Sequence, residues 1–356
     1  MVAALFQEQM ADVEAALVCS VALAWELLTL ASWCTGVGQP KRARALLQLA
    51  GAFKLDAFWK WVHSSQADKE YARNNPRFHP RLHAEHMIAI DQLHGALQVP
   101  NRMIPKWDSL GVPDIEVHSL CYYNSTTATR PEGGRKQLPE MSVPNHQAYA
   151  QRHSHKYVLH RDLLDPTIAA QYNKILLAKS VLEAPDAPEW MLFVDCDAFF
   201  TNFTVAPADL LELYGASQSS GNEAYGPDFI VAEDPGGINT GVFFARRSAW
   251  TLGFLEQVAR SNFKVAWDQS MFFGEILHLA GLLQPEEIAS GSDFSLPGQV
   301  VFAHQAHLNA FVAPPATDWH AYEWQAGDFV RHFAGCPYVE PECYALMEET
   351  VELMKG

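Results

Sequence analysis

Two aspartates, Asp195 and Asp197, follow an unbroken apolar run at 190–194 and are separated by a single residue. A continuous run of this kind predicts a strand buried on both faces, as in a parallel sheet. Ligands of open α/β sheets bind at the carboxyl ends of such strands. Because residues at i and i+2 of a strand face the same side, both carboxylates can meet one hard cation. Alternatively, one carboxylate holds the cation and the other a ligand hydroxyl, or the pair only caps a turn or forms salt bridges.

A histidine, His332, ends another short apolar stretch within 327–336. A lone histidine is more often structural than a ligand. This one matters because imidazole beside two carboxylates makes a mixed nitrogen and oxygen set, which suits manganese better than calcium. The sequence therefore offers a three-residue candidate for a metal site.

Two further segments bring polar side chains to expected turns or helix starts. The stretch 236–241 has three glycines and Asn239, so the backbone can approach a ligand closely while the amide binds a hydroxyl. A plain tight turn explains it equally well. Asp268 and Gln269 stand at the expected start of a helix, where the carboxylate has a functional role or serves as an N-cap.

The elements that must position these residues alternate between strands and helices, which predicts an α/β fold with a mixed or parallel sheet. Strands are expected at 115–123, 157–159, 190–194, 229–232 and 242–245. One helix is expected to begin with Asp165 as N-cap and Pro166 in the first position, and another with Ser248 as N-cap. Lys174 would lie on the first helix, off the centre of its apolar stripe. The stretch 126–137 has loop composition.

Composition excludes several classes of protein. With 356 residues and 49% hydrophobic content, the chain can bury a full core and is not disordered or fibrous. Its 25 basic and 41 acidic residues give a formal charge of −16, which repels a phosphate backbone, so we expect no nucleic-acid partner. An enzyme this acidic needs local positive charge to handle a phosphorylated substrate, and a divalent cation would supply it.

The six cysteines are too scattered for a disulfide scaffold or a zinc module. Only Cys336 and Cys343 lie close enough in sequence to suggest a local disulfide, and two unpaired thiols fit equally well.

An apolar stretch at 15–34 is long enough to span a bilayer. Acidic residues precede it and basic residues follow it, so the positive-inside rule would leave the main body in the cytosol. The other interpretation is a buried helix paired with 43–62. The polar stretch 64–81 resembles a linker, and the main α/β body is expected to start near residue 115.

The order of these motifs from about residue 115 to 337 resembles glycosyltransferase family 34, which includes fungal galactosyl- and mannosyltransferases and plant xyloglucan xylosyltransferases. The matching elements are Tyr149-Ala150 before Lys156-Tyr157, Lys174, the stretch 190–202, Asn239-Thr240-Gly241, Asp268-Gln269, Asn309 and 327–336. Any one of these elements alone can occur by chance, but the ordered set is fairly specific. The chain departs from the family pattern at Tyr172, where a tryptophan is usual, and in lacking a convincing N-terminal anchor.

The resemblance implies a GT-A fold with an N-terminal helical appendage. It implies a metal-dependent retaining enzyme that moves a hexose or pentose from a UDP-sugar or GDP-mannose to a glycan or glycoprotein. The cofactor would be Mn²⁺ or Mg²⁺, and the compartment the Golgi or secretory-pathway lumen. The expected divisions are a helical region and linker, the GT-A domain and a tail, at 1–110, 111–345 and 346–356.

The resemblance also assigns roles by position. Asp195 and Asp197 correspond to the metal- and donor-binding pair, and His332 to the remaining protein ligand of the metal. Lys174 would lie near the donor and add positive charge where the diphosphate leaves. Asn239 and Gly241 would line the sugar site, and two catalytic candidates would lie beside the anomeric carbon. These are Asp268, as a nucleophile, and Gln269, in support of attack from the leaving-group side, and the choice stays open.

Two other functions remain as alternatives. One is a catalytically silent GT-A module that binds sugar or a partner, although no metal residue is missing. The other is a haloacid-dehalogenase-like phosphatase, in which two spaced aspartates supply nucleophile and acid. Phe199 stands where that class normally has Thr or Val, and the later motifs have no role in it.

Overall fold

The computed structural model describes residues 113–122, 134–216, 219–220, 223–224, 226–234, 237–261, 267–279, 298–312, 323–334 and 342–353. The expected N-terminal helices, the apolar stretch 15–34, the linker and Cys336 lie outside these ranges, so the predictions about them stay untested. Within the described residues, no helix combines the length and apolar character that crossing a bilayer requires.

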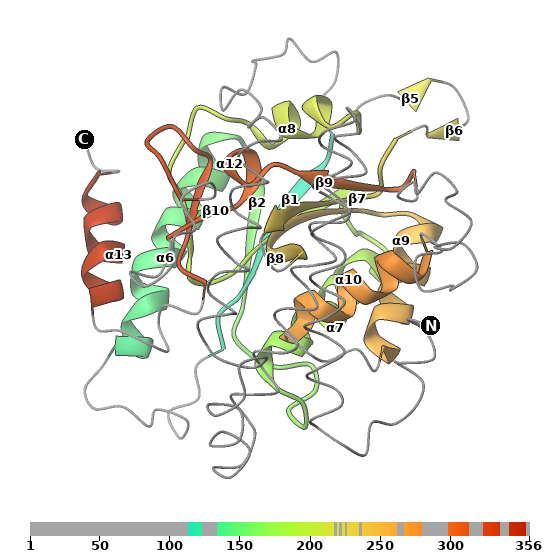
Figure 1. Ribbon diagram of the computed structural model, residues 1–356, viewed down its shortest axis with the longest axis horizontal. Helices are drawn as coiled ribbons and strands as arrows, with labels where there is room; N and C mark the ends of the chain where they lie inside the picture. The colour runs from blue at the N-terminus through green and yellow to red at the C-terminus, as the bar shows by residue number, and fades with distance from the viewer. Residues whose placement is uncertain are drawn as a thin grey trace, which may run out of the picture.

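A six-stranded sheet forms the centre of the molecule, with the strand order β2-β1-β3-β8-β7-β9 (Figure 1). Its strands are β1 (Ile115–Leu120), β2 (Lys156–His160), β3 (Trp190–Val194), β7 (Phe229–Asp234), β8 (Gly237–Arg246) and β9 (Val300–Ala303). β1 is parallel to both β2 and β3, and β7 is parallel to β9, whereas β8 is antiparallel to β3 and β7. The sheet is therefore mixed, as predicted.

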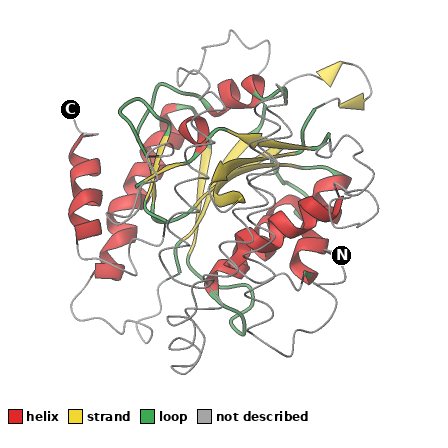
Figure 2. Cartoon of the chain, in the orientation of Figure 1, coloured by secondary structure: helices red, strands yellow, loops and turns green. Residues whose placement is uncertain are grey.

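Helices cover both faces of this sheet (Figures 1 and 2). On one face lie α7 (Ala170–Glu183), α9 (Ala249–Arg260) and α10 (Trp267–Leu279). The other face is covered by α6 (Gly134–Arg152), α8 (Pro207–Leu213) and α12 (Gln305–Leu308), with α13 (Glu342–Leu353) packed outside α6. This layered arrangement confirms the predicted α/β class and is consistent with a GT-A fold. α13 runs across the domain boundary expected at 345, and the boundaries themselves stay a prediction.

The central strand β3 is buried on both faces, as its continuous apolar sequence predicted. Met191 and Phe193 pack into the core beneath α7, α9 and α10. Trp190, Leu192 and Val194 pack into the core on the α6 side. Each of these side chains is at most 1% exposed, so the strand that carries the acidic pair is held from both sides.

Between β1 and β3 the chain changes the direction in which it adds strands to the sheet. The chain passes from β1 through α6 to β2 on one side of β1, then through α7 to β3 on the other side. Ligands of open α/β sheets bind at such a switch point, outside the carboxyl ends of the strands. Asp195 directly follows β3, so the acidic pair lies at this point.

A second, small sheet is attached to the same turn. It has the order β10-β11-β4, made of Ala310–Phe311, Val330–His332 and Ala198–Phe200. β4 begins one residue after Asp197, and β11 pairs with it antiparallel. A short hairpin, β5 (Ser219–Ser220) with β6 (Glu223–Ala224), completes the described strands.

Three local predictions were wrong. The expected loop 126–137 gives way to helix α6 from Gly134 onward, and α6 itself was not predicted. The helix expected at Asp165 begins at Ala170, because the Asp165 carboxylate instead accepts bonds from the amide and hydroxyl of Thr167, at 2.8 and 2.6 Å. Residues 239–241 lie within β8 rather than in a turn.

The cap predicted at Ser248 is confirmed, since its side chain accepts a bond from the Thr251 amide at 3.0 Å. Phe254, Leu255 and Val258 then pack into the core from one face of α9, as expected from their spacing.

Candidate active site

The backbone of the acidic turn is fixed by bonds to two neighbouring strands. The Asp195 amide donates to the Gly241 carbonyl of β8 at 2.7 Å, and the Phe333 amide donates to the Asp197 carbonyl at 2.9 Å. A bond of 3.1 Å from the Ala198 amide to the Asp195 carbonyl closes the turn itself. These bonds hold the two carboxylates at the sheet edge while leaving 25% of the Asp195 side chain and 18% of that of Asp197 exposed.

The small sheet brings His332 to this turn. His332 lies opposite Ala198 in the β11–β4 pair, and its Nε2 atom is 3.3 Å from Oδ1 of Asp197. The imidazole is buried, and among the described residues its Nδ1 atom has no hydrogen-bond partner. One ligand atom from each of Asp195, Asp197 and His332 lies within 4.8 Å of the others.

This donor set fits a divalent cation. Two carboxylates held close together repel each other unless a cation lies between them, and the unpartnered ring nitrogen lacks a group to bind. Carboxylate oxygens with imidazole nitrogen suit manganese or a similar ion. The three residues that the sequence proposed as metal ligands are thus brought together, and both the binding of an ion and its identity stay predictions.

Gly241 is required by the position of His332. A Cβ atom added at residue 241 would overlap the His332 ring, because the ring lies directly against the β8 backbone. The absence of a side chain therefore lets the histidine reach the acidic turn. The predicted contact of Gly241 with a sugar is not tested by this geometry.

Lys174 of α7 is buried beneath the acidic turn. Its Nζ atom lies 2.9 Å from Asp195 Oδ2, 3.1 Å from Asp268 Oδ2 and 3.1 Å from the carbonyl oxygen of Thr240. An ammonium group has three N–H donors, so these three acceptors use all of them. Lys174 therefore joins Asp195, a candidate metal ligand, to Asp268, the catalytic candidate on α10.

The charged groups in this cluster shift one another's pKa values. Burial alone would lower the pKa of Lys174, but Asp195 and Asp268 together raise it above its ordinary value, so the lysine stays protonated at neutral pH. Burial raises the pKa of Asp195 to about 6, with Asp197 adding to the rise while Lys174 and His332 oppose it. A carboxyl with a raised pKa is stabilised in its charged form when a cation binds.

Asp268 lies in the first turn of α10, and its side chain is tied to the site. Besides the contact with Lys174, its Oδ2 atom accepts a hydrogen bond of 2.5 Å from the Thr240 hydroxyl. It is 5% exposed, so its carboxylate faces the cluster rather than solvent. Gln269 follows it on the helix and is partly exposed, and its predicted role stays untested.

Asn239 is buried in β8 near the same place. Its Oδ1 atom accepts bonds from the Gly241 amide at 2.9 Å and from Nδ2 of Asn309 at 2.8 Å. Asn309 is wholly buried, so the two amides fix the start of β8 against the end of α12. The contact of Asn239 with a sugar hydroxyl stays a prediction.

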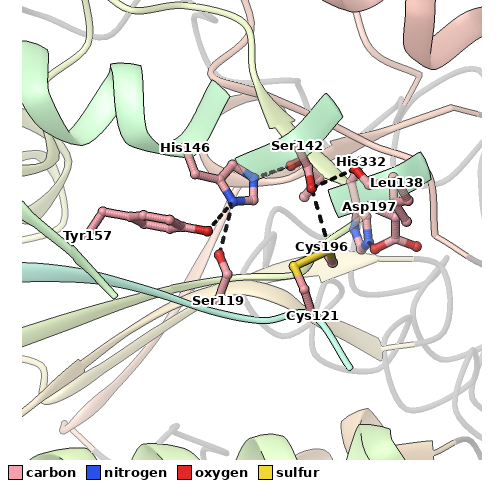
Figure 3. Close-up of a disulfide and its surroundings, with 10 residues drawn as sticks. Ser119, Cys121, Leu138, Ser142, His146, Tyr157, Cys196, Asp197 and His332 are labelled. Atoms are coloured by element: carbon pink, nitrogen blue, oxygen red, sulfur yellow. Dashed lines mark hydrogen bonds and ion pairs between the residues drawn. A yellow bond between two sulfur atoms is a disulfide. The ribbon is translucent and has the colours of Figure 1, made fainter. Parts of the chain in front are cut away.

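Sequence reasoning missed a set of residues on α6 that contact the acidic turn and β4 (Figure 3). The His146 ring contacts the Ala198 carbonyl at 2.6 Å through Nε2 and the Ser119 hydroxyl at 3.0 Å through Nδ1. The Asn145 side chain bonds both the amide and the carbonyl of Phe200 at 2.9 Å. The helix therefore pairs with the edge of β4 as another strand would.

A disulfide that sequence reasoning also missed joins Cys121 to Cys196, with a Cα–Cα distance of 5.3 Å (Figure 3). Cys121 directly follows β1, and Cys196 is the residue between the two aspartates. The partners are 75 residues apart in sequence, so spacing gave no signal. Cys343 is also disulfide-bonded, which excludes the alternative of an unpaired thiol at this position. Cys336, the partner considered for it, lies outside the described residues, so that pairing stays untested.

Comparison with known proteins gives the family. A family model described as the galactosyl transferase GMA12/MNN10 family matches residues 120–343, more than half of the chain. A protein of Schizosaccharomyces pombe named an uncharacterized alpha-1,2-galactosyltransferase is 28% identical over 226 residues, which are 54% of this chain and 55% of that protein. A rice protein (Oryza sativa subsp. indica) named "Probable glycosyltransferase 6" is 29% identical over 155 residues, 42% of this chain and 30% of that protein. The chain thus spans about half or less of these curated relatives.

Among solved structures, a glycosyltransferase involved in the glycosylation of the major capsid of PBCV-1 covers 66% of this chain and 100% of its own, at 15% sequence identity and a TM-score of 0.42. A likeness this low adds nothing to the description of the fold. The family match includes every predicted site residue, from Lys174 to His332. The chain belongs to the GMA12/MNN10 family of galactosyl transferases, the glycosyltransferase family 34 that its motifs resembled.

Proposed function

We propose that this protein is a metal-dependent retaining glycosyltransferase that moves a hexose or pentose from a nucleotide sugar to a glycan or glycoprotein. The observation that carries the proposal is the cluster of Asp195, Asp197 and His332 at the switch point of the sheet. The family match supports sugar transfer as the reaction class. The printed name of the fission-yeast relative makes UDP-galactose the first donor to test.

The three clustered residues would hold Mn²⁺, or Mg²⁺ in its place. When bound, the ion supplies Lewis-acid neutralisation of the charge that builds on the departing diphosphate. A chain of net charge −16 needs such a local positive centre to accept a diphosphate donor. Asp195 and Asp197 orient the site from the turn, and His332 closes it from the small sheet.

Lys174 would act as a positioning residue rather than as a direct ligand of the diphosphate. Its three donors already meet Asp195, Asp268 and the Thr240 carbonyl, which supports this role. As a buried cation it offsets the repulsion between the two carboxylates. It thereby keeps the metal site and the catalytic candidate in one fixed arrangement.

Retention of the anomeric configuration can proceed by two routes, and one candidate residue serves each route. In the first, Oδ1 of Asp268 bonds to the anomeric carbon as the bond to the diphosphate oxygen breaks. The acceptor hydroxyl oxygen then bonds to the same carbon and displaces the aspartate, while its proton passes to the departed diphosphate. The contacts to Oδ2 support this route, since they orient the carboxylate and leave Oδ1 as its reacting oxygen. In the second, Gln269 stabilises attack from the leaving-group side. Substitution of Asp268 by Ala with azide as external nucleophile tests the first route through the anomer formed.

The family and the disulfide support a secretory-pathway compartment, with the Golgi as the specific proposal. Disulfides form and persist in oxidising compartments and are rare in the cytosol. The Cys121–Cys196 bond is an observation independent of the family match and favours the same compartment. Localisation of the tagged full-length protein, with an alkylation assay of its cysteines, tests this proposal.

A donor panel tests the proposed function. Purified protein with Mn²⁺ is assayed against UDP-galactose, UDP-xylose, UDP-glucose and GDP-mannose, with and without EDTA. The expected result is slow hydrolysis or transfer with one donor that EDTA abolishes. Absence of both turnover and binding for all four donors would reject the proposal, whereas binding without turnover would favour the catalytically silent module.

A further inference from the structure

The Cys121–Cys196 disulfide lies inside the proposed active site rather than at the surface. Cys196 separates the two carboxylates of the acidic turn, and Cys121 is the first residue after the neighbouring strand β1. Both cysteines are nearly inaccessible, at 3% and 5% exposure. The proposed reaction uses neither sulfur, so the position of the bond calls for another explanation.

The main-chain bonding of β3 ends at different points on its two sides. Toward β8, pairing continues to Val194 opposite Val242, and the Asp195 amide then bonds the Gly241 carbonyl. Toward β1, pairing ends at Phe193 opposite His118. The acidic turn is therefore tied by its backbone to β8, and the disulfide provides its link to the end of β1.

The disulfide also packs against residues that support the rest of the site. It belongs to a buried cluster with Phe199, Phe333 and Leu138 among others, and Phe333 directly follows His332. The hydroxyl of Ser142, on α6, lies 3.4 Å from the Cys196 sulfur (Figure 3). The disulfide is thus packed among the same buried residues that support the acidic turn and His332.

We propose that the Cys121–Cys196 disulfide is a positioning device for the divalent-cation site, and that it holds Asp195 and Asp197 in the cation-binding arrangement before the ion arrives. The inference rests on the proposed function, since it concerns the same cation. Without the ion, Lys174 offsets only part of the repulsion between the two carboxylates. The backbone of the turn is bonded to β8 and to Phe333 beside β11, but β3 has stopped pairing with β1 before the turn begins. Without the disulfide, the turn could therefore relax away from β1 and separate the carboxylates. The cross-link to β1 opposes that relaxation, so less free energy is lost in ordering the site on binding.

The direct test is binding of Mn²⁺ alone, measured from the electron paramagnetic resonance signal of the free ion. The variant combines Cys121→Ala with Cys196→Ser, because the new hydroxyl at 196 keeps the Ser142 hydroxyl as a partner. Supporting groups around metal ligands are typically worth roughly 10- to 100-fold in affinity, so Mn²⁺ should bind at least about tenfold more weakly.

Cys343→Ser is the matched control, because it opens a disulfide whose cysteine does not flank a metal ligand. It should leave Mn²⁺ affinity unchanged. Far-UV circular dichroism and thermal unfolding report any loss of fold in each variant. Equal Mn²⁺ affinity in the double variant and wild type, with only a lower melting temperature, would overturn the inference and leave the proposed function intact.

A second measurement decides the matter if the double variant does not fold. Folded wild type is reduced with tris(2-carboxyethyl)phosphine, which takes oxygen from water to become the phosphine oxide while each cysteine sulfur gains a proton. After desalting, Mn²⁺ affinity should fall by the same factor and return on reoxidation, and Cys343→Ser should behave alike. Affinity unchanged by reduction of the Cys121–Cys196 bond would overturn the inference. A wild-type protein that binds no Mn²⁺ would reject both this inference and the proposed metal site.

Discussion

At the scale of single residues, Gly241 shows how steric space determines a candidate metal ligand. The His332 ring occupies the position that a side chain at 241 would take, so glycine is needed for packing rather than for backbone freedom. Sequence alone showed a glycine two residues after Asn239 and suggested close approach of a sugar. The steric requirement became visible only when β11 brought His332 against β8.

We therefore predict that Gly241→Ala weakens Mn²⁺ binding by about tenfold or more, because the methyl group displaces the His332 imidazole. Overpacking at this buried position should also lower the free energy of unfolding by about 1–3 kcal/mol. Titration of Mn²⁺ and chemical unfolding measure the two effects. Gly253→Ala is the control, since a Cβ at this position in α9 meets no atom within 4 Å. Mn²⁺ affinity equal in all three proteins would contradict the role of Gly241.

Thr240 is the residue that orients the catalytic candidate Asp268 through its hydroxyl. Thr240→Val removes this donor and keeps a β-branched side chain in the strand, so the fold should lose only about 1 kcal/mol. We predict that the turnover number falls by roughly tenfold while Mn²⁺ affinity stays the same, because Asp268 is not one of the clustered ligands. Thr240→Ser keeps the hydroxyl and should retain most of the activity. If Thr240→Val and Thr240→Ser have the same turnover number, the catalytic role of Asp268 does not depend on the hydrogen bond from Thr240.

At the scale of secondary structure elements, α6 is the support on which the acidic turn rests. Its polar side chains at 142, 145 and 146 contact the turn and β4, so that side of the helix is neither apolar nor solvent-exposed. Pro139 and Pro144 lie inside the helix, and each removes one main-chain donor. Two prolines make this segment a poor helix candidate from sequence alone. The tertiary contacts of Asn145 and His146 offset the free energy that the helix loses at these prolines.

We predict acid sensitivity of the fold through His146. Burial lowers its pKa from 6.5 to about 4, although the Ala198 carbonyl and Asp197 favour the protonated ring. The unfolded chain therefore binds a proton between these two values while the folded chain does not, so stability falls as pH falls. From pH 7 to 5 this group alone should lower the free energy of unfolding by about 2 kcal/mol.

His146→Gln is the matched variant for this prediction, because the amide can donate to the Ala198 carbonyl and accept from the Ser119 hydroxyl without titrating. Unfolding by urea at pH 7 and pH 5 should show a smaller pH dependence in the variant, by about 2 kcal/mol. Other groups titrate equally in both proteins and cancel. The same pH dependence in both proteins would mean that His146 is not the acid-sensitive group.

The sequence predicted those elements whose signal is local and apolar. β3 could be recognised from its continuous hydrophobic run, and α9 from the Ser248 cap and the spacing of its core residues. Asp165 does not cap the helix as predicted, because its side chain accepts a bond from Thr167 in a turn, and this bond competes with capping. The Cys121–Cys196 bond and the Lys174–Asp268 contact depend on tertiary approach, so spacing along the chain gave no indication of them.

At the scale of the whole molecule, the site is assembled from both sheets and from helices on one face. The main sheet supplies the acidic pair at its switch point, the small sheet supplies His332, and α7 and α10 supply Lys174 and Asp268. The motifs could be placed in order from sequence because the family match extends over 120–343. Their convergence on one point requires the fold. A site built from so many segments is lost with global unfolding, so each variant must be shown to be folded.

The most direct test of the account compares donor binding by wild type and Asp197→Ala, with Mn²⁺ and with EDTA, using the donor selected by the panel. Asp197 is partly exposed and lies outside the hydrophobic core, so its substitution should leave the thermal unfolding curve nearly unchanged. We predict that wild type binds the donor only with Mn²⁺, and that Asp197→Ala loses this metal-dependent binding while staying folded. Donor affinity equal to that of wild type in the folded variant would contradict the account and locate the site elsewhere.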